Sequence, residues 1–136
     1  MAIVRTFLDA NVLIRAFRGV GDIAERACAI LDDANRGFVC SDILRLELLP
    51  KAQYHGQHAE ESFYSEFFEA AAHLVETTPD LVDSATDFAR RYGLSAADAL
   101  HVAAAIRAGA EELVTAEKPA KLLFRVIELR VVSIAA

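Results

Sequence analysis

The stretch TFLDANVLI, residues 6–14, joins two hydrophobic patterns at a single acidic residue. The apolar, partly β-branched run from Ile3 to Leu8 stops at Asp9, and Val12 and Leu13 then begin a pattern of helical spacing. This change of period predicts a strand followed directly by a helix. In a sheet of parallel strands, side chains from separate loops converge beyond the carboxyl ends of the strands, where Asp9 is expected. Asp is also a common helix cap, so the other carboxylates have to decide between these two roles.

The charge balance limits how the chain could meet a nucleic acid. The 136 residues carry 20 Asp and Glu against 14 Lys and Arg, a formal net charge of −6, which argues against binding through a broad basic surface. Carboxylates gathered into one site and holding divalent cations would remove this objection, since bound metal inverts the local charge. Six basic residues form either a localised rim beside such a site or ordinary solvated surface: Arg15, Arg18, Arg45, Lys51, Lys118 and Lys121.

Length and composition indicate a single domain over residues 1–136 with one hydrophobic core. The hydrophobic content of 54% leaves room for an oligomeric interface, yet no apolar run approaches the roughly 18 residues of a membrane span. The N-terminal segment lacks the uninterrupted apolar core of a secretory signal. Cys28 and Cys40 have neither metal-site nor disulfide spacing and are expected to be small buried residues. We therefore expect a cytoplasmic protein without membrane contact.

A second strand and helix are predicted after the first pair. Asp22 is a candidate cap for a helix that closes near Asn35 and Gly37, and a short strand follows at 38–40. Ser41 then caps a third helix, in which Glu47 shares a face with apolar neighbours and is expected to point inward. Pro50 is expected to kink or loosen this helix.

The second half of the chain is predicted to be mostly helical with two late strands. One long helix, or two, is expected over 57–75, with Glu60, Glu61 and Glu69 on its wet side. Further helices are expected over 79–92, started by Thr77 and Thr78, over 99–108 after a capping box from Ser95 to Asp98, and from Pro119. Strands are expected over 111–115 and 127–134. This order predicts an α/β sandwich with a mainly parallel sheet.

Four acids are candidates for a shared site: Asp9, Glu47, Asp98 and Glu117. Each has an ordinary structural explanation as a cap, as a surface residue, or as an acid at a helix N-terminus. Together they are better explained as a hard-cation site, because Mg²⁺ and Mn²⁺ prefer carboxylate oxygen and water. The helix dipole is expected to keep Asp98 ionised.

Such a site suits one reaction class, in which metal-activated water attacks a phosphodiester. Asn11 and Thr115 are candidates to orient the Asp9 carboxylate or a bound water. His101, three residues after Asp98, is interpreted as a core residue or a support for the site rather than as a ligand. His55 and His58 lack the partners of a zinc site.

These residues carry a family resemblance. LDANVLI at 8–14, Glu47 within RLELLP, SAADALHVAAA from Ser95 and LVTAE ending at Glu117 together resemble a PIN-domain ribonuclease, most closely the single-domain toxins of VapBC-type toxin–antitoxin pairs. The resemblance covers essentially the whole chain and implies a PIN-like three-layer sandwich. It also implies a Mg²⁺- or Mn²⁺-dependent endoribonuclease with Asp9, Glu47 and Asp98 as its acidic triad. A homodimer and an inhibitory antitoxin partner, whose tail occupies the groove, are implied as well.

One motif departs from the family pattern. Relatives usually place an Asp after T-x, whereas this chain reads TAEKPAK from Thr115, so the role of Glu117 as a fourth ligand stays open. Three acids are enough for one ion. Two rival functions also stay open: a phosphatase-type phosphoryl transfer to Asp9, although Asn11 stands where such enzymes need an acid, and a catalytically silent PIN-like binding or scaffold module.

Overall fold

The structure, a computed structural model, describes residues 3–136, so the first two residues of the predicted domain 1–136 lie outside it. The strands are β1 (Val4–Leu8), β2 (Arg36–Ser41), β3 (His73–Val75), β4 (Glu112–Thr115) and β5 (Arg130–Ser133). The helices are α1 (Ala10–Arg18), α2 (Asp22–Leu31), α3 (Asp42–Tyr54), α4 (His58–Ala70), α5 (Pro79–Tyr92) and α6 (Ala96–Arg107), with a short 3₁₀ helix η1 (Leu122–Arg125).

The five strands form one sheet in the order β3-β2-β1-β4-β5, and every pairing in it is parallel. Thr6 of β1 is opposite Phe38 on one side and Glu112 on the other. The chain moves outward from β1 through β2 to β3 and then returns across β1 to β4. The strand order therefore reverses at β1, and a crevice for a ligand is expected beyond the carboxyl ends of β1 and β4.

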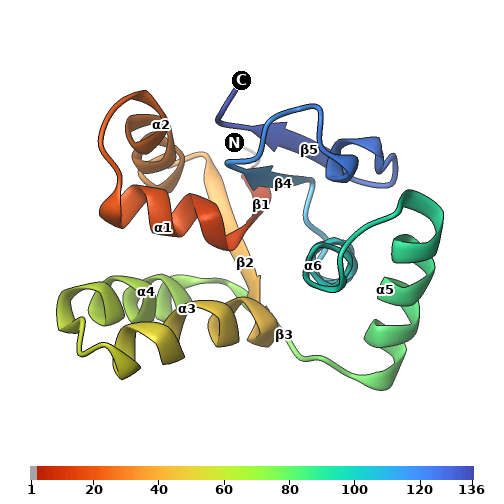
Figure 1. Ribbon diagram of the computed structural model, residues 1–136, viewed down its shortest axis with the longest axis horizontal. Helices are drawn as coiled ribbons and strands as arrows, with labels where there is room; N and C mark the ends of the chain where they lie inside the picture. Colours follow the sequence, from red (N-terminus) through yellow and green to blue (C-terminus); the bar gives the residue numbers. More distant parts are fainter. Residues whose placement is uncertain (1–2) are drawn as a thin grey trace.

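Helices cover both faces of the sheet (Figure 1), which confirms the predicted three-layer sandwich. The crossovers that carry α1–α2 and α3–α4 run in one direction along the sheet, and the crossover that carries α5–α6 runs in the other. Because parallel crossovers are right-handed, these two sets lie on opposite faces. Figure 1 shows α1 to α4 on the left of the strands and α5 with α6 on the right.

The core lies on both faces of the three central strands. Phe7 and Leu8 of β1 and Leu113 and Val114 of β4 are fully buried. Helix α6 packs against the sheet through a run of small side chains, residues 102–105, all of them buried. Their size lets the helix approach the strands closely, which brings its first turn to the carboxyl edge. Within residues 3–136, no helix is long and apolar enough to cross a bilayer.

Side-chain caps fix the starts of several helices as predicted. Ser41, Thr78 and Ser95 each accept a hydrogen bond from the backbone amide three residues later. Asp22 is not a cap as predicted, because Gly21, with φ of 88°, occupies the cap position and Asp22 lies in the first turn. Pro50 lies inside α3, which continues to Tyr54, so the expected loosening does not end the helix.

Two predicted helices are wrong in part. The segment 57–75 is not all helical, because α4 ends at Ala70 and β3 follows, pairing with β2 at the sheet edge. Three residues are too few to show a strand period, so this pairing decides their conformation. The helix predicted from Pro119 is instead the 3₁₀ helix η1. Leu123 and Val126 are buried three residues apart, which is the repeat of a 3₁₀ turn.

Two burial predictions are also wrong. Glu60, expected on the wet side of its helix, is buried against Arg18 and Tyr64. Cys28 is exposed, whereas Cys40 is buried as predicted, and burial raises the pKa of its thiol to about 11. The Glu60 error arises because a helical period identifies a face but not what packs against it, whereas the Cys28 prediction was made from residue type alone.

Candidate active site at the carboxyl edge of the sheet

Asp9 follows β1 at the point where the strand order reverses. Its side chain is nearly buried, with the residue 8% exposed. One carboxylate oxygen, Oδ1, accepts the Ala10 amide at 2.8 Å, and the other, Oδ2, accepts the Thr115 hydroxyl at 3.0 Å. Asp9 is therefore the cap of α1 and also a fixed acid at the crevice, so the two roles considered from the sequence are not exclusive.

Thr115 and Asn11 connect the ends of β4 and β1. Asn11 accepts the Ala116 amide at 2.9 Å through Oδ1, and its Nδ2 donates to the Thr115 hydroxyl at 3.3 Å. The same hydroxyl accepts the Glu117 amide at 3.1 Å. Asn11 thus fixes the loop after β4, and it reaches Asp9 only through Thr115. The hydroxyl of Thr115 contacts the Asp9 carboxylate directly, as the sequence predicted.

Glu47 comes from α3 and is joined to Asp9 by a histidine. His101 of α6 lies with Nε2 at 2.5 Å from Glu47 Oε1 and at 4.0 Å from Asp9 Oδ1. The imidazole is 2% exposed and the Glu47 side chain is 35% exposed. Within residues 3–136 the other ring nitrogen, Nδ1, is buried without a hydrogen-bond partner. The polar edge of His101 therefore faces the two acids, and Glu47 points inward, as expected, while part of it stays accessible.

Asp98 enters the site from the first turn of α6. Its amide donates to the Ser95 hydroxyl at 3.2 Å, which forms the predicted cap. Burial raises the pKa of Asp98, and the charges of Asp9 and Glu117 raise it further. The helix dipole, from which we expected easy ionisation, is therefore outweighed by desolvation and by like charge. Asp98 and Glu117 also line one pocket, together with Lys121.

Asp9 and Asp98 both have raised pKa values in this site. Burial raises the pKa of Asp9, and the charge of Glu47 adds to this effect, although His101 and Thr115 act in the opposite direction. Burial acts to lower the pKa of His101, but its bond to Glu47 and the nearby Asp9 raise it overall. A cation that entered the site would offset both the burial of these carboxylates and the like charge beside them.

The donor types fit a hard divalent cation, because they are carboxylate oxygens with a hydroxyl and an amide beside them. Across residues 3–136, however, no three side chains among His, Cys, Asp and Glu stand together closely enough to form a ready-made metal cluster.

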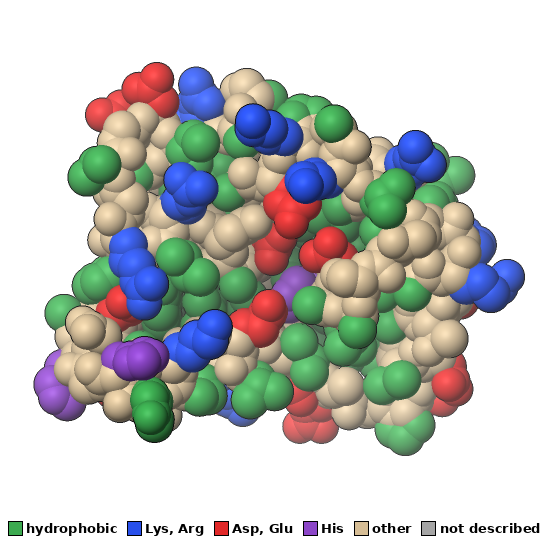
Figure 2. Space-filling view, viewed as in Figure 1, with side chains coloured by type: hydrophobic (Ala, Val, Ile, Leu, Met, Phe, Trp, Pro, Cys, Tyr) green, Lys and Arg blue, Asp and Glu red, His purple; other side chains and the backbone are tan. Residues whose placement is uncertain are grey.

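Figure 2 shows acidic side chains and a histidine in a line across this face, with basic side chains on both sides of the line. Within the predicted basic rim, Arg18 and Lys51 line a pocket with Glu47, and Lys121 lines the pocket of Asp98 and Glu117. Three of the six predicted rim residues therefore lie beside the acids, in two separate pockets.

Two groups of residues near the site were not identified as important from the sequence. His101 was interpreted as support only, yet it contacts one acid and lies near another; its spacing of three from Asp98 within a helix was the available signal. The buried group of Glu60 and Tyr64 beneath Arg18 was missed altogether. Their spacing of four on one helix face was visible in the sequence, but the partner on α1 was not.

Comparison with known proteins identifies the family to which this chain belongs. A family model described as PIN domain matches residues 6–121. A search of curated protein sequences finds no match. Among solved structures, VapBC2 from Rickettsia felis, bound to a DNA fragment from its promoter, matches with a TM-score of 0.71 and 18% identity. That match covers 96% of this chain and 98% of the other.

Two further solved structures are similar over almost their full length. DNA-bound VapBC from Salmonella typhimurium matches with a TM-score of 0.67 and 16% identity, covering 97% of this chain and 99% of that one. VapBC-1 from nontypeable Haemophilus influenzae matches with a TM-score of 0.65 and 18% identity, covering 98% and 100%. At these identities the likeness establishes the shared fold.

Proposed function

The chain belongs to the PIN-domain family, and from that premise we propose that it is a metal-dependent endoribonuclease that hydrolyses phosphodiester bonds in RNA. The observation that carries the proposal is the convergence of acids from separate elements at the switch point of the sheet. Asp9 follows β1, Glu47 comes from α3, and both contact or approach His101. Asp98 of α6 lies near enough to Asp9 for its pKa to respond to that charge.

We assign Asp9, Glu47 and Asp98 as the acidic triad, with Glu117 as a possible additional ligand for Mg²⁺ or Mn²⁺. When bound, such an ion supplies an activated water and neutralises charge at the phosphodiester. The protein's own part is to hold the acids in place. Thr115 and the Ala10 amide fix the two oxygens of Asp9, and His101 fixes Glu47. A group whose supporting contacts lock its rotamer is ready for catalysis without further ordering.

We test this proposal with a 5′-labelled, unstructured RNA and the full chain in Mg²⁺ or Mn²⁺. Cleavage is expected in either ion and none in EDTA. Asp9→Asn and Asp98→Asn should each lower the rate by at least about 100-fold, since each removes an anionic oxygen ligand. Asp22→Asn is the matched control, because Asp22 lies in the first turn of α2 and outside the site. It should cleave like the wild type.

Three results would decide between this proposal and the rival functions. An undiminished rate in Asp9→Asn or Asp98→Asn, with circular dichroism showing a native fold, would refute the acidic assignment. Turnover of a chromogenic phosphate ester without RNA cleavage would favour the phosphatase. The absence of both activities, together with no binding of Mn²⁺ by calorimetry, would leave the scaffold module.

We further propose that the chain is the toxin of a type II toxin–antitoxin pair and that it forms a homodimer. The support for a cognate antitoxin is that all three similar structures described above are VapBC toxin–antitoxin proteins. The support for a dimer is exposed apolar surface on α3, where Leu46 is 65% exposed. If a small reading frame for a DNA-binding protein lies directly upstream, co-expressing it should suppress cleavage, and sedimentation should give twice the chain mass.

A further inference from the structure

Arg18, at the end of α1, is held by a buried carboxylate on α4. Its Nε donates to Glu60 Oε1 at 2.9 Å, and its Nη2 lies 2.8 Å from Glu60 Oε2. The Glu60 side chain is 6% exposed, whereas that of Arg18 is 56% exposed. Two parallel contacts of this kind fix the plane of a guanidinium as well as its position. Arg18 therefore presents an ordered positive charge at the surface.

Tyr64 completes the support from below. Its buried hydroxyl donates to Glu60 Oε2 at 2.6 Å, so three donors satisfy the two oxygens of this carboxylate. Although burial acts to raise the pKa of Glu60, the bonds from Arg18 and Tyr64 lower it overall. Burial and the Glu60 charge raise the pKa of Tyr64 well above its usual value. Glu60 is thus ionised and Tyr64 protonated at neutral pH, which keeps the support intact.

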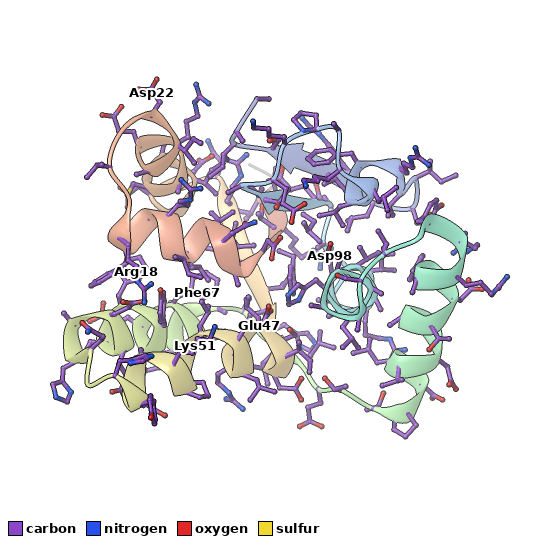
Figure 3. The ribbon with its side chains drawn as sticks, in the orientation of Figure 1. Arg18, Asp22, Glu47, Lys51, Phe67 and Asp98 are labelled. Atoms are coloured by element: carbon purple, nitrogen blue, oxygen red, sulfur yellow. The ribbon has the colours of Figure 1, made fainter. Side chains whose placement is uncertain are left out.

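One edge of Arg18 remains free. Among the contacts within residues 3–136, its Nη1 has neither a hydrogen-bond nor an ion-pair partner. The pocket beside it, about 110 Å³, is lined by Arg18, Lys51 and Glu47. Figure 3 shows Arg18, Lys51, Glu47 and Asp98 following one another from the α1 side of the molecule toward α6. The fixed cation therefore lines the same pocket as Glu47, one of the acids of the site.

A purely structural ion pair has a different form in this protein. Arg36 bonds Glu112 through Nε and Asp33 through Nη1, and its side chain is only 21% exposed. Both of its edges are occupied by carboxylates. Arg18 has one carboxylate, more than half of its side chain in solvent, and a pocket beside it. The contrast indicates a side chain positioned to bind a ligand.

We propose that Arg18, positioned by Glu60 and Tyr64, binds a backbone phosphate of a single-stranded RNA that runs from the acidic site past Glu47 toward α1. This inference rests on the proposed function. Arginine matches phosphate oxygens through paired N–H donors, and a guanidinium already held in place loses less freedom on binding. Lys51, on the same pocket, adds a second cationic contact.

The test measures binding of a fluorescein-labelled 12-nucleotide oligouridylate by anisotropy, with the full chain in EDTA over a salt series. Arg18→Gln is expected to weaken binding about 5–10-fold and to reduce the slope of log affinity against log salt by about 0.7, the value for one phosphate contact in a single strand. Tyr64→Phe should weaken binding about twofold to threefold, because it leaves Arg18 in place but less ordered. Arg90→Gln, which removes an exposed α5 arginine paired with Asp87, is the matched control.

A second variant distinguishes loss of the RNA contact from loss of folding. Arg18→Gln leaves Glu60 buried without its cation, so the double variant Arg18→Gln with Glu60→Gln is measured beside it. It should show the same loss of RNA affinity while melting close to the wild type. In cleavage assays Arg18→Gln should raise KM with kcat within about twofold, since the contact is to a phosphate other than the reacting one.

Each outcome decides the inference. A salt slope unchanged from Arg90→Gln in both variants, or a loss confined to kcat, would overturn it. So would a loss of affinity for a labelled heptaglutamate peptide with RNA binding unchanged, which would make Arg18 an anchor for an acidic protein partner. If the wild type binds RNA through Arg18 but cleaves none in Mg²⁺ or Mn²⁺, the anchor stands and the proposed nuclease fails.

Discussion

The two ends of the sheet treat buried acids in opposite ways. Near its amino end, Glu112 of β4 is buried, but it accepts the Thr6 hydroxyl at 2.7 Å and Arg36 Nε at 2.8 Å. At its carboxyl end, Asp9 and Asp98 have no Lys or Arg partner among the ion pairs of residues 3–136, and Asp9 approaches only His101. The sheet therefore has an acid with a cationic partner at its amino end and acids without one, with pKa values raised mainly by burial, at its carboxyl end.

This difference separates structural acids from candidate functional ones better than burial does. Glu112 and Asp9 are both buried, and both contact a threonine of the neighbouring strand. What differs is the counter-charge, which the chain supplies to Glu112 through Arg36. An acid that folding leaves without its cation costs stability and is retained where an outside cation can enter. The comparison can be tested at either end.

Removing the positive charge of Arg36, at the amino end of the sheet, should have the largest effect on stability. Arg36→Met leaves Glu112 buried and unpaired, which is expected to lower the free energy of unfolding by about 2–4 kcal/mol. Urea denaturation followed by circular dichroism measures this loss. The double variant Arg36→Met with Glu112→Met should recover most of the stability, because no charge is then left buried. A double variant as unstable as the single one would show that packing of the Arg36 stem, and not its charge, matters here.

Supplying a cation at the carboxyl end should give the next largest effect. With 10 mM Mn²⁺ and a dissociation constant of about 1 mM, linkage predicts a gain of about 1.4 kcal/mol, or about 3–5 °C in Tm. Arg36→Met should gain as much as the wild type, since its defect is at the other end. Asp9→Asn and Asp98→Asn should gain little. An equal rise in all four proteins would place the bound ion elsewhere on the surface.

The sequence predicted the fold well where local and global signals agree. The change of period at Asp9, the Ser41, Thr78 and Ser95 caps and the order of elements led to the sandwich, which the structure confirms. It failed where a short segment takes its conformation from a neighbour. β3 exists because it pairs with β2, and residues 73–75 have no periodicity of their own. The 3₁₀ turn after Pro119 is a similar case.

The candidate site was predictable in its acids but not in their surroundings. Acids that follow strand ends are visible in sequence, and so was the role of Thr115, because neighbouring parallel strands end together. The contact of His101 with Glu47 joins residues that are 54 positions apart, and that of Arg18 with Glu60 joins residues 42 positions apart. Single-sequence patterns report spacing within one element, so partners on different helices stay hidden.

Neutralising one acid at the carboxyl end should have the smallest effect on Tm, and the size of that effect depends on pH. The pKa of Asp98 is raised above its ordinary value of 3.8 by burial, Asp9 and Glu117. Its charge therefore costs stability above the raised pKa, and the cost disappears as pH falls toward the ordinary value. Asp98→Asn should raise Tm by about 1–3 °C at pH 8 and leave it unchanged near pH 4.

Asp42 offers a control for this prediction with the opposite sign. Although burial acts to raise its pKa, hydrogen bonds from the Thr77 hydroxyl and amide lower it overall. Its charge therefore adds stability above the ordinary pKa, and that stability is lost as pH falls through the lowered value. Asp42→Asn should lower Tm at pH 8, where Asp98→Asn raises it. If both variants shift Tm in the same direction at pH 8, the acids at the carboxyl end are not repelling one another, and the contrast with Glu112 fails.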